Sequence, residues 1–220
     1  MRPNYLFQNS SISEVLDVRG SQCRQKVDTI PRDRFLATPL DDLVEFIVAD
    51  MSIEPLVIYE DRMNREQTEI NIDVAGWPGR YTRGTGPWLV SGIRVVVALP
   101  YSGDSNLWDI CPNTFGTMPP FGDVRSDAVE MKFESPLDEP LERIKDRLND
   151  NLRMIKQYLT WQRPSIDDFN RNLHSIARSA VEARRTRLKS TISSRFCWTF
   201  RSAIIQTLRT CVQSVFSAES

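Results

Sequence analysis

Apolar residues follow two different periods along the chain, and each period predicts one kind of element. After Thr38 and Pro39, apolar side chains recur every three or four residues, as on one face of a helix. Thr38 is expected to cap this helix, and Pro39 suits its first position. A shorter helix is expected around residues 12–16, with Gly20 at its end. The expected buried face of the clearer helix consists of Leu40, Leu43, Val44, Ile47 and Val48.

The middle of the chain shows the two-residue alternation that is typical of half-buried strands. Residues 93–99 form the most β-prone run of the whole sequence. Because apolar and polar positions alternate in these segments, we expect an antiparallel sheet with one buried face. The expected strands lie at residues 56–59, 68–74, 89–100, 107–110 and 129–134.

Helical periodicity returns after Pro136 and continues for about five turns. The segment Trp161–Pro164 is expected to break this helix, because proline lacks the amide proton that a helix interior requires. Ser165 then resembles the capping residue of a second helix, whose apolar face includes Phe169 and Leu173. Two long helices joined by a short turn form an antiparallel pair.

These elements predict a single α+β domain over residues 1–188 and a different kind of segment after it. The domain combines an antiparallel sheet with an N-terminal helix and a C-terminal pair of long antiparallel helices. Residues 189–220 form a divergent tail: from Ser190 onward it holds eleven serines and threonines, three basic residues and one acid. Its apolar residues recur every fourth position, which is typical of a short amphipathic helix. Its abrupt change in composition instead favours an out-of-frame translation product, and both alternatives stay open.

Net charge and cysteine spacing argue against several classes of function. The formal net charge is −1, so no overall field attracts nucleic acid or an anionic membrane. The four cysteines lie far apart and there is one histidine, so no zinc site is expected. Signal-like and long apolar runs are missing, so we expect a cytoplasmic protein with no cofactor, no specific nucleic acid and no membrane partner.

The sharpest enzymatic pattern lies around the last expected strand. Asp123 or Asp127 precedes Glu130 and Lys132, and an acid followed by Glu-x-Lys on a strand is how metal-dependent nucleases hold a divalent ion and a water-activating lysine. A half-exposed strand shows a polar residue at every second position, so the same pattern also arises without any function. A metal-dependent nuclease using Asp123, Glu130 and Lys132 is therefore the alternative to a chain with no catalytic residues.

The helical part of the chain carries three short motifs that support a resemblance. These are Ile-x-x-Tyr-Leu-x-Trp at 155–161, Phe-Asn-x-x-Leu at 169–173 and Arg-Arg-x-x-Leu at 184–188. With them, the chain resembles an uncharacterised bacterial N-terminal domain that is often found ahead of Toll/interleukin-receptor-type (TIR) effector domains. The resemblance covers roughly residues 5–188. Similar upstream segments lie at residues 53–55, 100–104 and 111–115.

The resemblance implies a non-enzymatic regulatory, sensor or interaction module of a bacterial effector protein, including those of antiphage defence. A protein partner or self-association is then expected, and no catalytic residue carries over. Asn170 is expected to bond to a loop backbone, because an amide beside an apolar stripe needs a partner. From Ser190 onward the chain departs from the family pattern, hence the hypothesis that a frameshift removed an effector domain. The residues expected to serve structure or interaction are Trp161, Phe169, Asn170, Leu173, Arg184 and Arg185.

Overall fold

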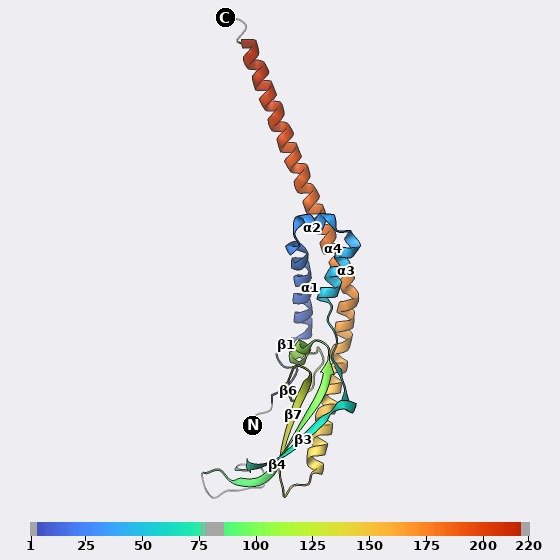
Figure 1. The fold of residues 1–220 in the computed structure, drawn as a ribbon, viewed down its shortest axis with the longest axis vertical. Helices are drawn as coiled ribbons and strands as arrows, with labels where there is room; N and C mark the ends of the chain where they lie inside the picture. Colours follow the sequence, from blue (N-terminus) through green and yellow to red (C-terminus); the bar gives the residue numbers. More distant parts are fainter. Residues whose placement is uncertain (1–3, 76, 78–85, 217–220) are drawn as a thin grey trace. The chain divides into compact units, whose positions relative to one another are not determined.

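The computed structural model describes residues 4–75, 77 and 86–216, with side chains up to residue 190. The chain divides into two compact units: Met1–Arg19 with Ser52–Arg171, and Gly20–Met51 with Asn172–Ser220. Helices and an antiparallel sheet are both present, which confirms the predicted α+β class (Figure 1). The predicted end of a domain at residue 188 stays a prediction.

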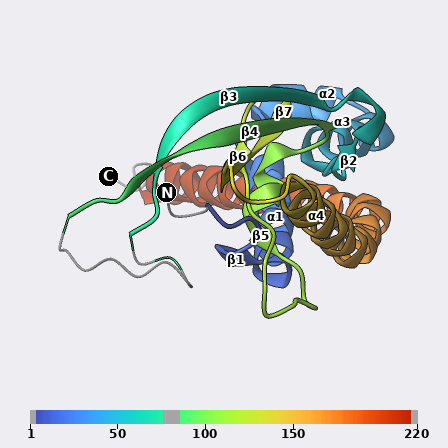
Figure 2. The same cartoon turned by 90° about the horizontal axis from the view of Figure 1, so that it is seen from below.

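The first unit contains a five-stranded sheet with β4 (Leu89–Ser102) as its central strand. β7 (Ala128–Pro136) pairs along one edge of β4 and β3 (Asn64–Asp73) along the other. β2 (Val57–Ile58) pairs with the end of β4, and β6 (Asp123–Val124) pairs with β7. All of these pairings are antiparallel, as predicted, and Figure 2 shows β3 and β4 running together.

Alternation along the strands separates an apolar face of the sheet from a polar one. In β7, Val129, Met131 and Phe133 are fully buried, whereas the residues between them are only half-buried. Arg147 of the following helix lies over the Phe133 ring, 5.5 Å from its centroid, so this helix lies against the buried face. Each such buried side chain contributes about 1.5–3 kcal/mol relative to exposure, which fixes the register of the strand.

The segment between β4 and β6 contains less strand than predicted. Residues Ser105–Asp109 form the 3-10 helix η2, because the Asp104 carboxylate accepts a hydrogen bond from a backbone N–H of its first turn. Only β5 (Ile110–Cys111) is extended, and it pairs in parallel with β1 (Ser10–Ser11). A second 3-10 helix, η1 (Glu60–Arg62), lies between β2 and β3.

The long C-terminal helix α4 (Glu142–Phe216) is continuous, so the predicted pair of long helices is wrong. Pro164 lies inside α4, and Ser165, predicted to cap a second helix, is an interior residue. A proline inside a helix costs about 3 kcal/mol. Burial of Tyr158 and Ile166 on either side outweighs this cost, because each buried side chain contributes about 1.5–3 kcal/mol.

The second unit is helical and contains most of α1 (Ile12–Thr29), all of α2 (Arg32–Ala37) and α3 (Leu40–Met51), and the later part of α4. α1 continues through Gly20, so its predicted end there is wrong; a glycine costs a helix only about 1 kcal/mol. Thr38 caps the C-terminus of α2, not the N-terminus of α3, because its hydroxyl donates to a carbonyl of α2. The buried side chains include Cys23, Val27, Phe35, Leu43, Val44, Ile47, Ala177 and Val181.

The tail predicted after residue 188 continues α4 as helical backbone to Phe216. Its predicted apolar stripe lies in residues whose side chains are outside the described part of the chain. Among the residues that the structure describes, we find no helix with a stretch long and apolar enough to cross a membrane.

Candidate functional site

Polar side chains of α4 hold two segments of the first unit, the loop of residues 112–122 and the residues around η2, by their backbone groups. The Asn151 amide accepts from the N–H of Phe121 at 3.0 Å and donates to its carbonyl oxygen at 2.9 Å. The Tyr158 hydroxyl binds the N–H and the carbonyl of Gly116 at 3.1 and 3.2 Å. The buried Gln162 amide donates to two carbonyl oxygens around η2. These bonds satisfy backbone groups that a loop otherwise leaves to water.

The β5–β6 loop (residues 112–122) receives two of these contacts, at Gly116 and Phe121. Two large apolar side chains of the same loop face solvent: Phe115 is 67% exposed and Met118 is 76% exposed. A loop held at two points changes its conformation little when a partner arrives, which lowers the entropic cost of binding. The loop therefore presents an apolar pair on a fixed backbone.

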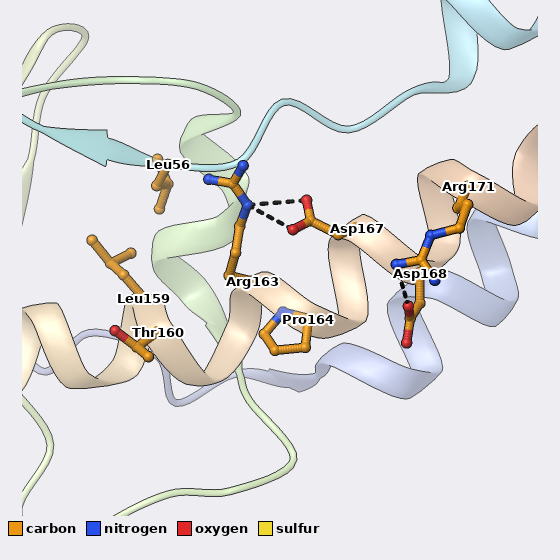
Figure 3. A pocket seen from close by; sticks show the side chains of 8 residues that line it. All are labelled: Leu56, Leu159, Thr160, Arg163, Pro164, Asp167, Asp168 and Arg171. Carbon is orange, nitrogen blue, oxygen red and sulfur yellow. Dashed lines mark hydrogen bonds and ion pairs between the residues drawn. The ribbon is translucent and has the colours of Figure 1, made fainter.

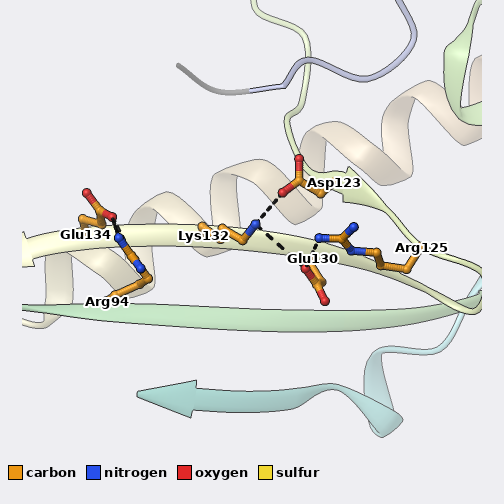
Figure 4. Close-up of polar contacts among 6 residues, drawn as sticks. All are labelled: Arg94, Asp123, Arg125, Glu130, Lys132 and Glu134. Carbon is orange, nitrogen blue, oxygen red and sulfur yellow. Dashed lines mark hydrogen bonds and ion pairs between the residues drawn. The ribbon is translucent and has the colours of Figure 1, made fainter. Parts of the chain in front are cut away.

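Four charged residues of the β6–β7 hairpin form a cluster on the polar face of the sheet (Figure 4). Asp123 and Glu130 lie directly opposite each other on the two strands. Lys132 Nζ lies 2.6 Å from Asp123 Oδ2 and 3.9 Å from Glu130 Oε2. Arg125 Nη2 lies 3.0 Å from the same Glu130 oxygen. The hydrogen bond from Lys132 lowers the pKa of Asp123 below its ordinary value.

The structure thus brings together the three residues of the predicted nuclease pattern, Asp123, Glu130 and Lys132. Each of the two carboxylates already has a cationic partner, Lys132 for Asp123 and Arg125 for Glu130. In the part of the chain that the structure describes, no three His, Cys, Asp or Glu side chains are grouped to hold a metal ion. A divalent ion at this place would have to displace both ion pairs.

A cavity of about 900 Å³ opens beside this cluster. Its apolar lining includes Tyr5, Trp77, Met118 and Met154, which belong to four different segments of the first unit. Four acidic and two basic residues complete the charged part of the lining. The cavity therefore combines an apolar wall with four acids that each have a cationic partner: Lys132 for Asp123, Arg125 for Glu130, Arg94 for Glu134 and Arg153 for Asp150.

A second, more open groove of about 600 Å³ lies along α4 at Pro164 (Figure 3). Arg163 Nε lies 3.0 and 2.9 Å from the two carboxylate oxygens of Asp167. Arg171 Nη2 lies 2.9 Å from Asp168 Oδ1. These charges are balanced in pairs within one helix.

Three of the predicted interaction residues hold the fold of the first unit. Asn170 Oδ1 accepts from the N–H of Ile53 at 3.0 Å and its Nδ2 donates to the Ile53 carbonyl at 2.8 Å, so the predicted bond to a loop backbone is confirmed. Phe169 is buried. Trp161 is half-buried, with its ring centroid 5.2 Å from that of Tyr158. A role of these residues in interaction stays a prediction.

The other three predicted residues belong to the second unit. Leu173 is fully buried there. The Arg184 guanidinium donates to two carbonyl oxygens at the end of α1 and lies over the Phe35 ring, 4.3 Å from its centroid. Arg185 Nη2 donates to the carbonyl of Thr38, the residue that caps α2, at 2.7 Å. Positive charge at a helix C-terminus is favourable, so Arg184 stabilises the end of α1 and Arg185 the end of α2.

The roles of Asn151, Tyr158 and Gln162 in binding loop backbone were not predicted from the sequence. Their spacing of seven and four places them on the same helix face as the buried apolar residues. A polar side chain on a buried face must find a hydrogen-bond partner, and this was the available signal.

The resemblance to TIR-associated domains stays a prediction. Comparisons with family models, with curated proteins and with solved structures find no match to this chain.

Proposed function

We propose that the chain is a non-enzymatic interaction module with a regulatory or sensor role in a bacterial effector protein. The observation that supports this function is the β5–β6 loop, which exposes Phe115 and Met118. Tyr158 and Asn151 hold the loop backbone from the side of α4. The first unit therefore keeps an apolar contact surface in a fixed geometry.

A partner that covers this loop gains free energy from the burial of apolar surface. Covering apolar surface contributes about 25 cal/mol per Å², and side chains such as Phe115 and Met118 expose much of theirs. Binding normally costs about 0.5–1.5 kcal/mol for each side chain that becomes ordered, and more where a loop must order as well. Because the backbone of this loop is already held, binding a partner costs less conformational entropy. More of the free energy of apolar burial therefore remains as binding free energy. Single exposed apolar residues are common on protein surfaces, so exposure alone does not indicate a contact site. Phe115 and Met118 differ from such residues because the backbone of their loop is held.

The cellular setting of the proposal comes from the motifs at 155–161, 169–173 and 184–188. Their resemblance to the domain ahead of TIR-type effectors favours a cytoplasmic module that senses or regulates, with antiphage defence as the setting. A protein partner or a second copy of the chain would then occupy the β5–β6 loop.

A photo-crosslinking experiment tests the proposal. A photoreactive phenylalanine analogue is placed at position 115 of the full chain, in the cells that make the protein. The same analogue at Val18, which is 55% exposed on α1 of the first unit, is the matched control. We expect a discrete crosslinked product from position 115 only, with a yield that falls when Met118→Glu is added.

Two outcomes would count against an interaction module. One is the same set of products from positions 115 and 18, which would indicate random collision. The other is a product at position 115 that Met118→Glu leaves unchanged, because a contact surface that includes both side chains cannot tolerate a charge at one of them.

A metal-dependent nuclease is the second candidate, supported by the convergence of Asp123, Glu130 and Lys132 on one face. In this mechanism the two carboxylates would bind a divalent ion, and Lys132 would orient a water for attack on a phosphodiester. Magnesium- or manganese-dependent DNA cleavage that disappears in Glu130→Ala would support it. No cleavage by the wild type, or retained cleavage in the variant, would rule it out.

A further inference from the structure

Strand β3 lies at the edge of the sheet, and Figure 2 shows it on the outside of β4. It pairs with β4 in an unbroken register from Asn64 to Asp73. Among the residues that the structure describes, no other strand pairs with β3, so its outer edge is open over ten residues. Natural edge strands are often short, bulged or interrupted by proline, because an open edge is a template for another chain. β3 shows none of these three features.

The odd-numbered residues of β3 direct their backbone groups to the open edge. Just beyond the strand, the N–H of Val74 donates to the carbonyl of Trp88 at 2.9 Å, which continues the ladder to β4. Alternate residues of a strand direct both backbone groups to the same edge, so the even-numbered residues face β4 and the odd-numbered ones face outward. The N–H of Arg65 donates to the Asn64 side chain at 2.9 Å, as expected for a group outside the β4 ladder.

Both faces of the first part of β3 are open as well. All residues from Asn64 to Glu69 are exposed, whereas Ile72 near the end of the strand is buried. Successive side chains of a strand point to opposite faces, so this run of exposed positions means that no described element covers either face here. Another strand therefore has access to this edge without displacing any described part of the chain.

The charges of this open segment are arranged symmetrically about Gln67. Arg65 lies two residues before Gln67, and Glu69 lies two residues after it. When two copies of β3 pair antiparallel with Gln67 opposite Gln67, each Arg65 lies directly opposite Glu69 of the other copy. Neither Arg65 nor Glu69 forms an ion pair with another described residue, so both are available for such a contact. Opposite charges at facing positions of two strands stabilise the pairing.

Charge also selects this register over its neighbours. Two antiparallel strands bond only where outward residues lie opposite outward residues, so few registers are allowed. A register centred on Glu66 places the two Glu66 carboxylates directly opposite each other, and facing like charges are destabilising. A register centred on Thr68 loses both contacts between Arg65 and Glu69. In the register centred on Gln67, the side-chain amide has both donors and an acceptor and is therefore able to bond to its own copy.

We propose that a second copy of this chain pairs antiparallel with the outer edge of β3, centred on Gln67, and joins the two sheets into one. Residues 64–70 of each copy would form about six main-chain hydrogen bonds between the copies. The N–H of Arg65 would then pass from the Asn64 side chain to the carbonyl of Glu69 in the other copy. Little apolar surface is covered, so we expect a weak dimer with a dissociation constant of about 10–100 µM.

This inference rests on the proposed interaction function and names the partner as a second copy, at a surface other than the β5–β6 loop.

The test measures self-association of the full chain by analytical ultracentrifugation, from about 1 to about 300 µM protein, and we expect a reversible monomer–dimer equilibrium. Arg65→Glu and Glu69→Arg should each weaken dimerisation at least about tenfold, because each change places like charges opposite each other twice. The chain that carries both changes should dimerise within about threefold of the wild type, since its charges are exchanged but still complementary. Glu66→Arg, at an exposed position opposite the uncharged Thr68, is the matched control and should stay within about threefold of the wild type.

Mixing the two single variants gives a second, independent readout. In a mixed pair each introduced charge faces an opposite charge of the other variant, so Arg65→Glu and Glu69→Arg chains should dimerise together although each alone associates poorly. In hydrogen exchange of the wild type, the outward amides of Gln67 and Glu69 should become slower as the protein concentration rises.

Three outcomes would overturn the inference: a chain that stays monomeric over the whole range, a dimer that both single variants leave intact, or a double variant that fails to recover. If crosslinking at position 115 gives its specific product while the chain stays monomeric, the interaction function stands and pairing through β3 is excluded. If the chain dimerises through β3 while position 115 gives no specific product, the pairing stands and the β5–β6 loop is excluded instead.

Discussion

The side-chain amide of Asn170 and the backbone of Ile53 exchange two hydrogen bonds, at 3.0 and 2.8 Å, over a sequence separation of 117 residues. Ile53 lies in the segment that leaves α3 and enters β2, outside the strands of the described part of the chain. The Asn170 side chain thus makes with Ile53 the two backbone hydrogen bonds that a neighbouring strand would make. Asn151 repeats the same geometry with Phe121, so α4 fixes two non-sheet segments in the same way.

Replacing Asn170 by leucine should destabilise the first unit strongly. The change leaves the N–H and the carbonyl of Ile53 without their partner, and each unsatisfied, partly buried group costs about 1–3 kcal/mol. We expect a loss of about 2–3 kcal/mol in the free energy of unfolding, measured by urea denaturation. Asn149→Leu, at an exposed position of the same helix, is the matched control and should change the stability little. An equal loss in both variants would contradict the role assigned to Asn170.

The strands were predictable because a half-buried sheet imposes its alternation on the sequence. Val129, Met131 and Phe133 are buried as the pattern required. The continuity of α4 was not predictable in this way, because Pro164 has a large local cost that only tertiary packing outweighs. Thr38 was predicted to cap the wrong helix for a related reason. Its hydroxyl is able to bond to either neighbouring helix, and only the tertiary structure selects α2.

The candidate site was predictable in part. The spacing of Asp123, Glu130 and Lys132 suggested a shared face, and a tight hairpin does bring them together. Lys132 forms an ion pair with Asp123, and Arg125 forms one with Glu130. Neither ion pair was predictable, because both depend on side-chain distances that cannot be read from a sequence. The exposure of Phe115 and Met118 was not foreseen, because a loop lacks the periodicity from which burial is inferred.

Replacing Pro164 by alanine should stabilise the protein. Alanine restores an N–H for the carbonyl four residues earlier and removes the ring clash, while the exposed side chain loses no buried contact. Part of the gain is offset, because proline also restricts the unfolded chain. We expect an increase of about 1–2 kcal/mol in the free energy of unfolding, measured by urea denaturation.

Pro140→Ala, just before α4, serves as the control and should have a small effect, since no helical hydrogen bond is missing there. A loss of stability in Pro164→Ala would show that α4 needs a bend at this proline.

Replacing Arg184 by methionine should destabilise the second unit. The guanidinium holds two carbonyl oxygens at the end of α1, and methionine satisfies neither of them. We expect a loss of about 2–4 kcal/mol, together with faster hydrogen exchange near the end of α1. Arg184→Lys should recover only part of the loss, because an ammonium group lacks the planar fork that reaches both carbonyls. Arg178→Met removes a more exposed ion pair with Asp41 and should cost less than about 1 kcal/mol.

Full recovery in Arg184→Lys would indicate that positive charge alone is needed at this helix end.

The ion pair between Asp123 and Lys132 should make part of the stability depend on pH. Because Lys132 lowers the pKa of Asp123 in the folded state, the stabilisation is present above the ordinary aspartate pKa of about 4. It is lost as the pH falls through the lowered folded-state pKa. Asp123→Asn should therefore cost about 0.5–1 kcal/mol at pH 7, a modest value because both side chains are about one-third exposed. As the pH falls through this lowered pKa, the wild type and the variant should converge, as measured by urea denaturation at each pH. Asp61→Asn, at a highly exposed carboxylate, should behave like the wild type throughout. A gap between Asp123→Asn and the wild type that stays constant down to pH 2 would show that the asparagine acts through packing and not through charge.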